Sequence, residues 1–327
     1  MLFYRSFFLF LLSYFSNTLA LQDSLRAIPN DVEVVHIVAM NHFDVGYNIK
    51  ENNNSPYMLD VVNGYFDVFF PQAVNLANEM RANGTDDRFI YTTHAWLVDL
   101  YLHCPTDWNV SGVPLHCPDP TSIAAFKKSI QQGDIYFHAG LFNTEYENCD
   151  NPEAVSLQFK YAKDLADELG VPRPQVLSLR DVPGTTRALI PLLVKENITA
   201  LTVGVNNGSP APAMPNPGIW SDPATDTSIL FMTTAQGQGY PDNPPQGMQK
   251  DYCVTFPNLT HAMCWAFRTD NSGPPLSVQE VLDQFAYARE QFPNAKVIAS
   301  TYENFIKELT TVRDQLPVVT SEVGDNW

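Results

Sequence analysis

The chain has 327 residues, with 19 Lys and Arg against 36 Asp and Glu, which gives a formal net charge of −17 at pH 7. This acidic balance argues against nucleic acid or an anionic membrane surface as a partner. The length and a hydrophobic fraction of 45% are sufficient for one large globular core.

The amino-terminal segment 1–20 has the features of a secretion signal. Arg5 precedes an apolar run from Phe7 to Leu12, and Thr18-Leu19-Ala20 offers a cleavage site with small residues. The run is short for a membrane span, although an uncleaved anchor is the alternative. We therefore expect a secreted or lumenal protein that has no membrane attachment after cleavage, with 21–327 as one α/β domain.

Two further features are typical of the secretory pathway. The five cysteines include Cys104/Cys117 and Cys253/Cys264, which bracket short loops suited to local disulfides and leave Cys149 over. Other pairings remain open on the sequence alone. Six Asn-x-Ser/Thr sequons predict N-glycosylation, at Asn53, Asn83, Asn109, Asn197, Asn207 and Asn258.

Strand-like and helix-like patterns alternate along the chain. The expected strands are 33–40, 88–92, 134–138, 175–179, 199–203, 228–233, 262–267 and 295–299. The expected helices are 57–82, 120–132, 151–169, 184–196, 277–291 and 301–314, and two Pro/Gly-rich stretches, from Gly204 to Gly218 and from Gly237 to Gly247, indicate long surface loops. This alternation predicts a parallel (β/α) distorted barrel of seven or eight strands. A doubly wound open sheet is the alternative.

The segment Asn41-His42-Phe43-Asp44-Val45-Gly46 directly follows the first expected strand. His42 and Asp44 are two residues apart on an extended segment, so their side chains point to the same side. An imidazole and a carboxylate placed in this way can bind one Zn²⁺ ion. The alternative is a strand end at which both residues only hydrogen-bond nearby backbone.

Asp181 stands at the junction between the fourth expected strand and the helix after it, within Arg180-Asp181-Val182-Pro183-Gly184. With His42 and Asp44 it forms a natural third metal ligand, and its carboxylate could also act as a nucleophile. The competing interpretation is a helix N-cap or turn residue, a position that Asp favours.

Other polar residues recur at the carboxyl ends of the expected strands, where active sites of parallel α/β folds lie. Asp270 is the candidate general acid; Glu145 and Glu147 are the other carboxylates at this end, and a turn residue is the alternative for Asp270. The candidate substrate-binding residues are Tyr47, Trp96, His138, Asn143, Glu145 and Asn271.

The order of these motifs resembles the catalytic domain of glycoside hydrolase family 38, the α-mannosidases, and most closely a branch of relatives with a similar amino-terminal domain. The matching segments also include 95–99, 138–143, 269–274 and 321–327. The resemblance implies a distorted barrel that holds one Zn²⁺ through His42, Asp44 and Asp181. It further implies that Asp181 is the nucleophile of a retaining glycosidase with a carbohydrate substrate.

Family members supply a later His as the fourth ligand and continue into further domains. No His of this chain matches that ligand, so we expect the chain to stop short after the catalytic domain. Two other functions fit the same residues. A metal-dependent sugar deacetylase would need no carboxylate nucleophile, and a non-catalytic carbohydrate-binding glycoprotein would need no fourth ligand.

Overall fold

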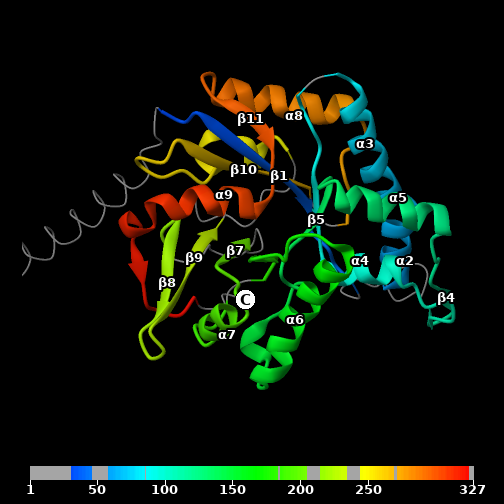
Figure 1. Ribbon diagram of the computed structural model, residues 1–327, viewed down its shortest axis with the longest axis horizontal. Helices are drawn as coiled ribbons and strands as arrows, with labels where there is room; N and C mark the ends of the chain where they lie inside the picture. Colours follow the sequence, from blue (N-terminus) through cyan, green and yellow to red (C-terminus); the bar gives the residue numbers. More distant parts are fainter. Residues whose placement is uncertain are drawn as a thin grey trace, which may run out of the picture.

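The computed structural model describes residues 31–45, 58–84, 86–182, 185–204, 214–233, 244–268 and 271–323. Two five-stranded sheets lie side by side, with most helices on their outer faces (Figure 1). The expected signal segment and the candidate residues Tyr47, Asn53, Asn207 and Asp270 lie outside the described residues.

The first sheet is built around β1 (Val34–Asn41), and all of its strand pairs are parallel. The strand order is β10-β1-β2-β5, where β10 is His261–Arg268, β2 is Tyr91–Thr93 and β5 is Ile135–Phe137. β11 (Lys296–Ala299) pairs with the first half of β1 and β2 pairs with its second half.

The second sheet has the order β12-β8-β9-β7-β6. These strands are β12 (Val318–Val319), β8 (Gly218–Asp222), β9 (Thr227–Thr233), β7 (Ala200–Gly204) and β6 (Val176–Arg180). Its pairs are parallel except for the antiparallel pair of β8 and β9. The short strands β3 (Asn109–Val110) and β4 (Val113–Pro114) pair separately.

The described strands do not close into the expected barrel, because they form two sheets instead of one. The sheets meet where Ala139 N–H, just past β5, donates to the Val176 carbonyl of β6 at 2.9 Å. With only three residues, β5 offers too short an edge for a ladder to β6. The carboxyl ends of β1, β2, β5 and β6 nevertheless follow one another across this junction.

The two sheets bury their facing sides against one another in a common core, which we call the shared core. Val38 and Met40 of β1 and Val176 of β6 belong to it, whereas Val35 and Leu177, on the opposite sides of these strands, lie in outer clusters under the helices. Helix α9 (Tyr302–Leu309) lies between the sheets and contributes to the shared core (Figure 1). Burial on both faces accounts for the nearly continuous apolar strands.

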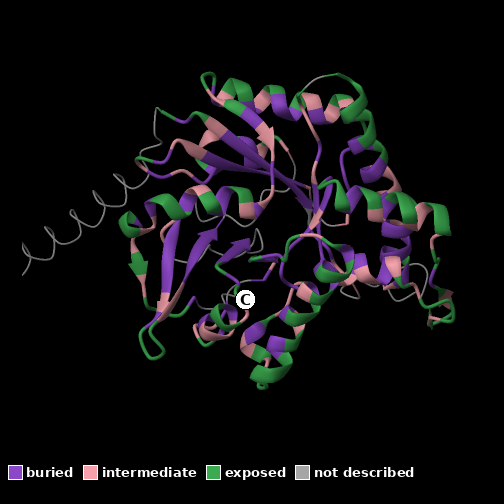
Figure 2. Ribbon diagram, viewed as in Figure 1, coloured by how far each residue is buried: buried purple, intermediate pink, exposed green. Residues whose placement is uncertain are grey.

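The outer helices turn their buried sides toward the sheets (Figure 2). They are α2 (Leu59–Gly64), α3 (Phe70–Ala82), α4 (Ala95–Leu102), α5 (Pro120–Gln131), α6 (Pro152–Leu169), α7 (Leu189–Lys195) and α8 (Val278–Gln291). A π-helical turn, Tyr65–Phe69, joins α2 to α3, so the expected helix 57–82 is not uniform. α7 begins later than expected because Thr185 forms an antiparallel bridge with Val323.

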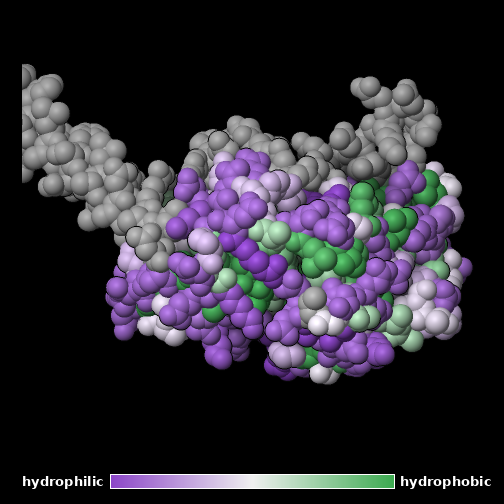
Figure 3. Space-filling model, turned by 90° about the horizontal axis from the view of Figure 1, so that it is seen from above, coloured by the Kyte–Doolittle hydropathy of each residue, from purple (hydrophilic) through white to green (hydrophobic). Residues whose placement is uncertain are grey.

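The structure contains both disulfides, Cys104–Cys117 and Cys253–Cys264, with Cys149 as a free thiol. The four sequon asparagines within the described residues, Asn83, Asn109, Asn197 and Asn258, are exposed, and their glycosylation stays a prediction. No helix among the described residues has the length and hydropathy required to cross a membrane. Hydrophilic residues dominate the face shown in Figure 3.

Candidate metal and active site

His42, Asp44 and Asp181 come together at the carboxyl ends of β1 and β6, one strand from each sheet. His42 Nε2 lies 2.9 Å from Asp44 Oδ1 and 3.6 Å from Asp181 Oδ2. One ligand atom from each residue lies within 4.8 Å of the others. Ligands bound about 2.0–2.2 Å from a tetrahedral zinc ion lie roughly 3.3–3.6 Å apart, so small shifts of these side chains would let the three residues hold such an ion.

The environment of these three residues, the metal trio, also suits a cation. The His42 side chain is 1% exposed, while those of Asp44 and Asp181 are 24% and 16% exposed. Two carboxylates beside one imidazole repel each other, and a divalent cation offsets that repulsion. Both carboxylates are therefore partly accessible to solvent, whereas the imidazole is not.

The backbone at Asp181 turns sharply as β6 ends. Asp181 has a left-handed φ of 57°, which is uncommon for a residue with a Cβ, although Asp tolerates it better than most. Its N–H donates to the Gly204 carbonyl at 2.6 Å. The N-cap of α7 is Ala188, so Asp181 does not cap that helix. An unusual conformation at a strand end is typical of functional positions.

Two asparagines bind the segments that carry the trio. Asn271 N–H donates to the His42 carbonyl at 2.9 Å, and the Asn271 side chain makes two hydrogen bonds to the backbone of Asp44. Asn143 Oδ1 accepts from the Arg180 N–H at 2.9 Å, and its Nδ2 lies 3.5 Å from His42 Nδ1. Asn143 therefore links the β6 end to the β1 end.

The remaining candidate residues have different surroundings. Trp96 packs its ring near Phe43 and Trp108, with centroids 6.0 and 6.5 Å away. Glu145 is exposed and accepts a hydrogen bond from Asn148 within its own turn, at 2.6 Å. Tyr47 and Asp270 lie outside the described residues, so the structure does not place the expected general acid.

His138 is fully buried and hydrogen-bonds to His94, a residue that is not among the predicted site residues. Burial lowers the pKa of His138 to about 3. Burial, and then the proximity of His138, His42 and Arg180, lowers the pKa of His94 well below its usual range. Both rings are therefore neutral. The signal for His94 was the period-two alternation of Thr92 and His94 on an extended segment.

Arg180 adds a buried cation to this end of the molecule. Its side chain is 1% exposed, and its guanidinium lies 3.7 Å above the centre of the Phe267 ring. A cation over an aromatic face is favourable, more so away from water. Phe267 belongs to the shared core, so the Arg180 guanidinium lies where the apolar side chains of that core meet the polar side chains at the strand ends.

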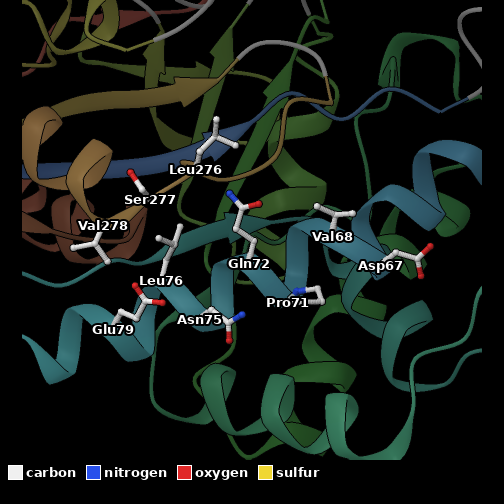
Figure 4. A pocket seen from close by; sticks show the side chains of 10 residues that line it. All are labelled: Asp67, Val68, Pro71, Gln72, Asn75, Leu76, Glu79, Leu276, Ser277 and Val278. Carbon is white, nitrogen blue, oxygen red and sulfur yellow. The ribbon is translucent and has the colours of Figure 1, made fainter.

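A hollow on the outer surface lies apart from the trio, between α3 and the start of α8 (Figure 4). Gln72, Leu76 and Glu79 line it on one side, and Leu276, Ser277 and Val278 on the other. Gln72 Nε2 donates to the carbonyls of Pro274 and Pro275. None of the trio lines this hollow, so it is not part of the candidate metal site.

No protein-family model and no curated protein matches this sequence. The fold is similar to that of an α-mannosidase from Enterococcus faecalis V583, with a TM-score of 0.62 and 15% identity over 89% of this chain and 31% of that one. It is similar to a protein in glycosyl hydrolase family 38 from Enterococcus faecalis, with a TM-score of 0.51 and 16% identity over 89% of this chain and 29% of that one.

A third similar structure is a putative polysaccharide deacetylase from Mycobacterium smegmatis, with a TM-score of 0.50 and 9% identity over 91% of this chain and 96% of that one. The chain therefore spans nearly the whole of this protein but under a third of the other two. At such identities the likeness establishes a fold shared with glycosidases and a deacetylase.

Proposed function

We propose that this protein is a secreted or lumenal zinc-dependent retaining glycosidase of the α-mannosidase type. The observation that carries the proposal is the convergence of His42, Asp44 and Asp181 from two sheets, at a spacing that suits one divalent ion. A fold similar to that of an α-mannosidase supports it. The substrate in this proposal is a neutral carbohydrate, in keeping with the acidic character of the chain.

His42, Asp44 and Asp181 would hold the ion, which as a Lewis acid would polarise sugar hydroxyls. The Asp181 carboxylate attacks the anomeric carbon, and the glycosidic C–O bond breaks as the ester bond forms. We assign Asp270 as the acid that gives a proton to the leaving oxygen. Water then attacks the anomeric carbon and breaks the ester bond, while the Asp270 carboxylate takes a proton from that water. The two displacements together retain the anomeric configuration.

The test is the Asp181→Ala variant, assayed for release of the aglycone from an aryl α-mannoside. We expect turnover to be lost, because both a ligand and the nucleophile are removed. His42→Ala should chiefly lose zinc, and added zinc should restore part of its activity. Asp226→Ala is a matched control, because Asp226 is also an Asp with a left-handed φ, 53°, but is exposed on the β8–β9 hairpin.

Wild-type turnover in Asp181→Ala would refute the glycosidase mechanism. Retention should be read directly from the anomeric signal of the first product by NMR, since the α and β anomers are distinct before they equilibrate. Inversion would exclude Asp181 as a nucleophile even if the variant is inactive.

A sugar deacetylase is the second candidate, because the chain covers nearly the whole of a putative polysaccharide deacetylase. In that function the metal trio would bind the ion, and a carboxylate would act as a base for water instead of attacking the sugar. The products differ, because a deacetylase releases acetate from an N-acetylated oligosaccharide and leaves its glycosidic bonds intact. Assays for acetate and for new reducing ends on the same sample distinguish the two.

A further inference from the structure

A buried chain of hydrogen bonds runs from the Gly140 amide to His94. Gly140 N–H donates to His138 Nδ1 at 3.1 Å, and His138 Nε2 lies 2.9 Å from His94 Nδ1. The two histidines are 0% and 1% exposed. Gly140 is suited to this position, because a Cβ there would lie 3.1–3.2 Å from ring atoms of His138 and 2.7 Å from Leu177 Cδ1.

This chain fixes the tautomers of both rings. A backbone N–H can only donate, so His138 Nδ1 accepts and the proton of the neutral ring resides on Nε2. His138 Nε2–H then donates to His94 Nδ1, which leaves the proton of His94 on its Nε2. His94 therefore cannot offer a lone pair to a metal in this state, and it is instead a hydrogen-bond donor.

His94 Nε2 is buried and has no hydrogen-bond partner among the described residues. An unpaired buried donor costs about 1–3 kcal/mol. A ring that served only for packing would avoid this cost as Phe. The imidazole at this position therefore points to a partner that the described residues do not provide.

The position of His94 indicates what that partner is. The His94 ring packs on Phe43, with centroids 5.3 Å apart, and Phe43 stands between the two ligands His42 and Asp44. Thr92, on the same face of β2, pairs in register with Met40, whose side chain faces the shared core. Two residues further along each chain segment, the same register brings His94 beside His42, just past the ends of β2 and β1.

We propose that His94 is a positioning residue of the metal centre, whose Nε2–H donates to an uncharged oxygen bound with the ion, either a water molecule or a sugar hydroxyl. This inference rests on the proposed function, because it requires an ion at the metal trio. The Gly140–His138 pair acts through His94, since it holds the ring against Phe43 and keeps the proton on Nε2.

The test compares three replacements of His94 by zinc affinity, measured in competition with a chromophoric chelator, and by melting temperature without zinc. His94→Gln can place an N–H close to the position of Nε2. His94→Asn retains an acceptor for His138 but loses the distant donor, and His94→Phe retains only the ring. We expect Phe and Asn to weaken zinc binding about 10-fold or more, as the loss of a supporting hydrogen bond around a metal site does, and Gln to stay within a few-fold of wild type.

Two controls separate positioning from packing. Thr92→Val removes a buried hydroxyl on the same face of β2 that, like His94 Nε2, has no partner among the described residues. This variant should leave zinc affinity unchanged. His36→Phe disrupts a second histidine pair, formed by buried His36 and partly buried His261 at the opposite end of β1, and should lower the melting temperature without changing zinc affinity.

Zinc binding by His94→Phe as tight as that of wild type would overturn the role of His94 and leave the proposed metal site standing. Equal losses of zinc affinity in the Gln, Asn and Phe variants, together with lower melting temperatures, would show that any replacement of His94 disturbs the fold, whether or not it keeps a donor near Nε2, and would also overturn the proposal. Failure of the wild-type protein to bind zinc would refute the metal site of the proposed function together with this inference.

Discussion

Asn271 and Asp44 form a reciprocal pair of hydrogen bonds between two segments more than 200 residues apart in the sequence. Asp44 N–H donates to Asn271 Oδ1 at 3.1 Å, and Asn271 Nδ2 donates to the Asp44 carbonyl at 3.0 Å. An amide side chain can satisfy a backbone N–H and C=O at the same time, as a neighbouring strand would. Asn271 thereby holds the segment that carries His42 and Asp44.

Asn271→Ala should loosen this segment. Loss of two hydrogen bonds at about 1 kcal/mol each predicts destabilisation of about 1–2 kcal/mol, measured by urea unfolding. Zinc affinity should also fall, because Asp44 loses its fixed backbone. Asn271→Asp retains the acceptor and loses the donor, so it should lie between wild type and Asn271→Ala in stability. An Ala variant with the stability of wild type would contradict this interpretation.

Gly140→Ala should disturb the buried histidine chain without removing any polar group. The added methyl would lie too close to both Leu177 and the His138 ring, and overpacking of this kind typically costs about 1–3 kcal/mol. Gly64→Ala is the control, because Gly64 lies within a helix and no atom is in reach of the new methyl, so this change should not destabilise the protein. Gly133 is less suitable because its φ is 74°. Differential scanning calorimetry of Gly140→Ala and Gly64→Ala measures the contrast.

His36 predicts a loss of stability in acid. Burial, and then the neighbouring His261, lowers the pKa of His36 from 6.5 to about 4. The unfolded chain therefore binds this proton more readily, so stability is greatest above pH 6.5 and falls as the pH drops toward 4. A shift of this size corresponds to about 3 kcal/mol. Ser300, Phe305 and, through His261, Glu308 complete the surroundings of the ring.

The measurement is the free energy of unfolding of wild type and His36→Phe between pH 4 and 7. We expect the wild-type curve to rise more steeply with pH than that of the variant, because the variant lacks the titrating group. His116→Gln, at an exposed position, is the control. Parallel curves for wild type and His36→Phe would show that His36 is not the group responsible.

The Cys104–Cys117 disulfide should stabilise the protein mainly by restricting the unfolded chain. It closes a loop with a sequence separation of 13 residues, and a loop of this size corresponds to about 3 kcal/mol in the chain-entropy account. A Cys104→Ala/Cys117→Ala variant should therefore have a lower melting temperature in the absence of reductant. Wild type and variant should converge once reductant is added, provided that Cys253–Cys264, which is buried, stays intact.

Strand positions could be predicted well from the sequence, because each strand of the shared core is buried on both faces and forms a short apolar run. The expected strand 33–40 became Val34–Asn41, and 175–179 became Val176–Arg180. These two strands fixed where His42, Asp44 and Asp181 would stand. The closeness of the three residues could not be predicted from spacing, since it depends on how the two sheets meet.

Other elements had no readable pattern. α4 was not expected, because Ala95, Leu97, Val98, Leu100 and Tyr101 are buried on more than one side, and the helix therefore lacks an apolar stripe with a period of 3.6 residues. β8 follows the Pro/Gly-rich stretch that indicated a loop, and its antiparallel pairing with β9 departs from the expected parallel order. The distorted barrel is not confirmed, since the described strands form two sheets, and strand count and alternation say nothing about whether the outermost strands meet.

The origin of the metal trio from both sheets links assembly to chemistry. His42 and Asp44 follow β1 in one sheet, and Asp181 follows β6 in the other, while the edges between the sheets share the hydrogen bond from Ala139 to Val176. An ion bound by all three side chains would cross-link the two sheets at these edges, and its binding energy would add to the stability of the assembled domain. If the two sheets separated at these edges, the three ligands would move apart even while each sheet remained folded. Release of the ion and separation of the sheets would therefore be the same event.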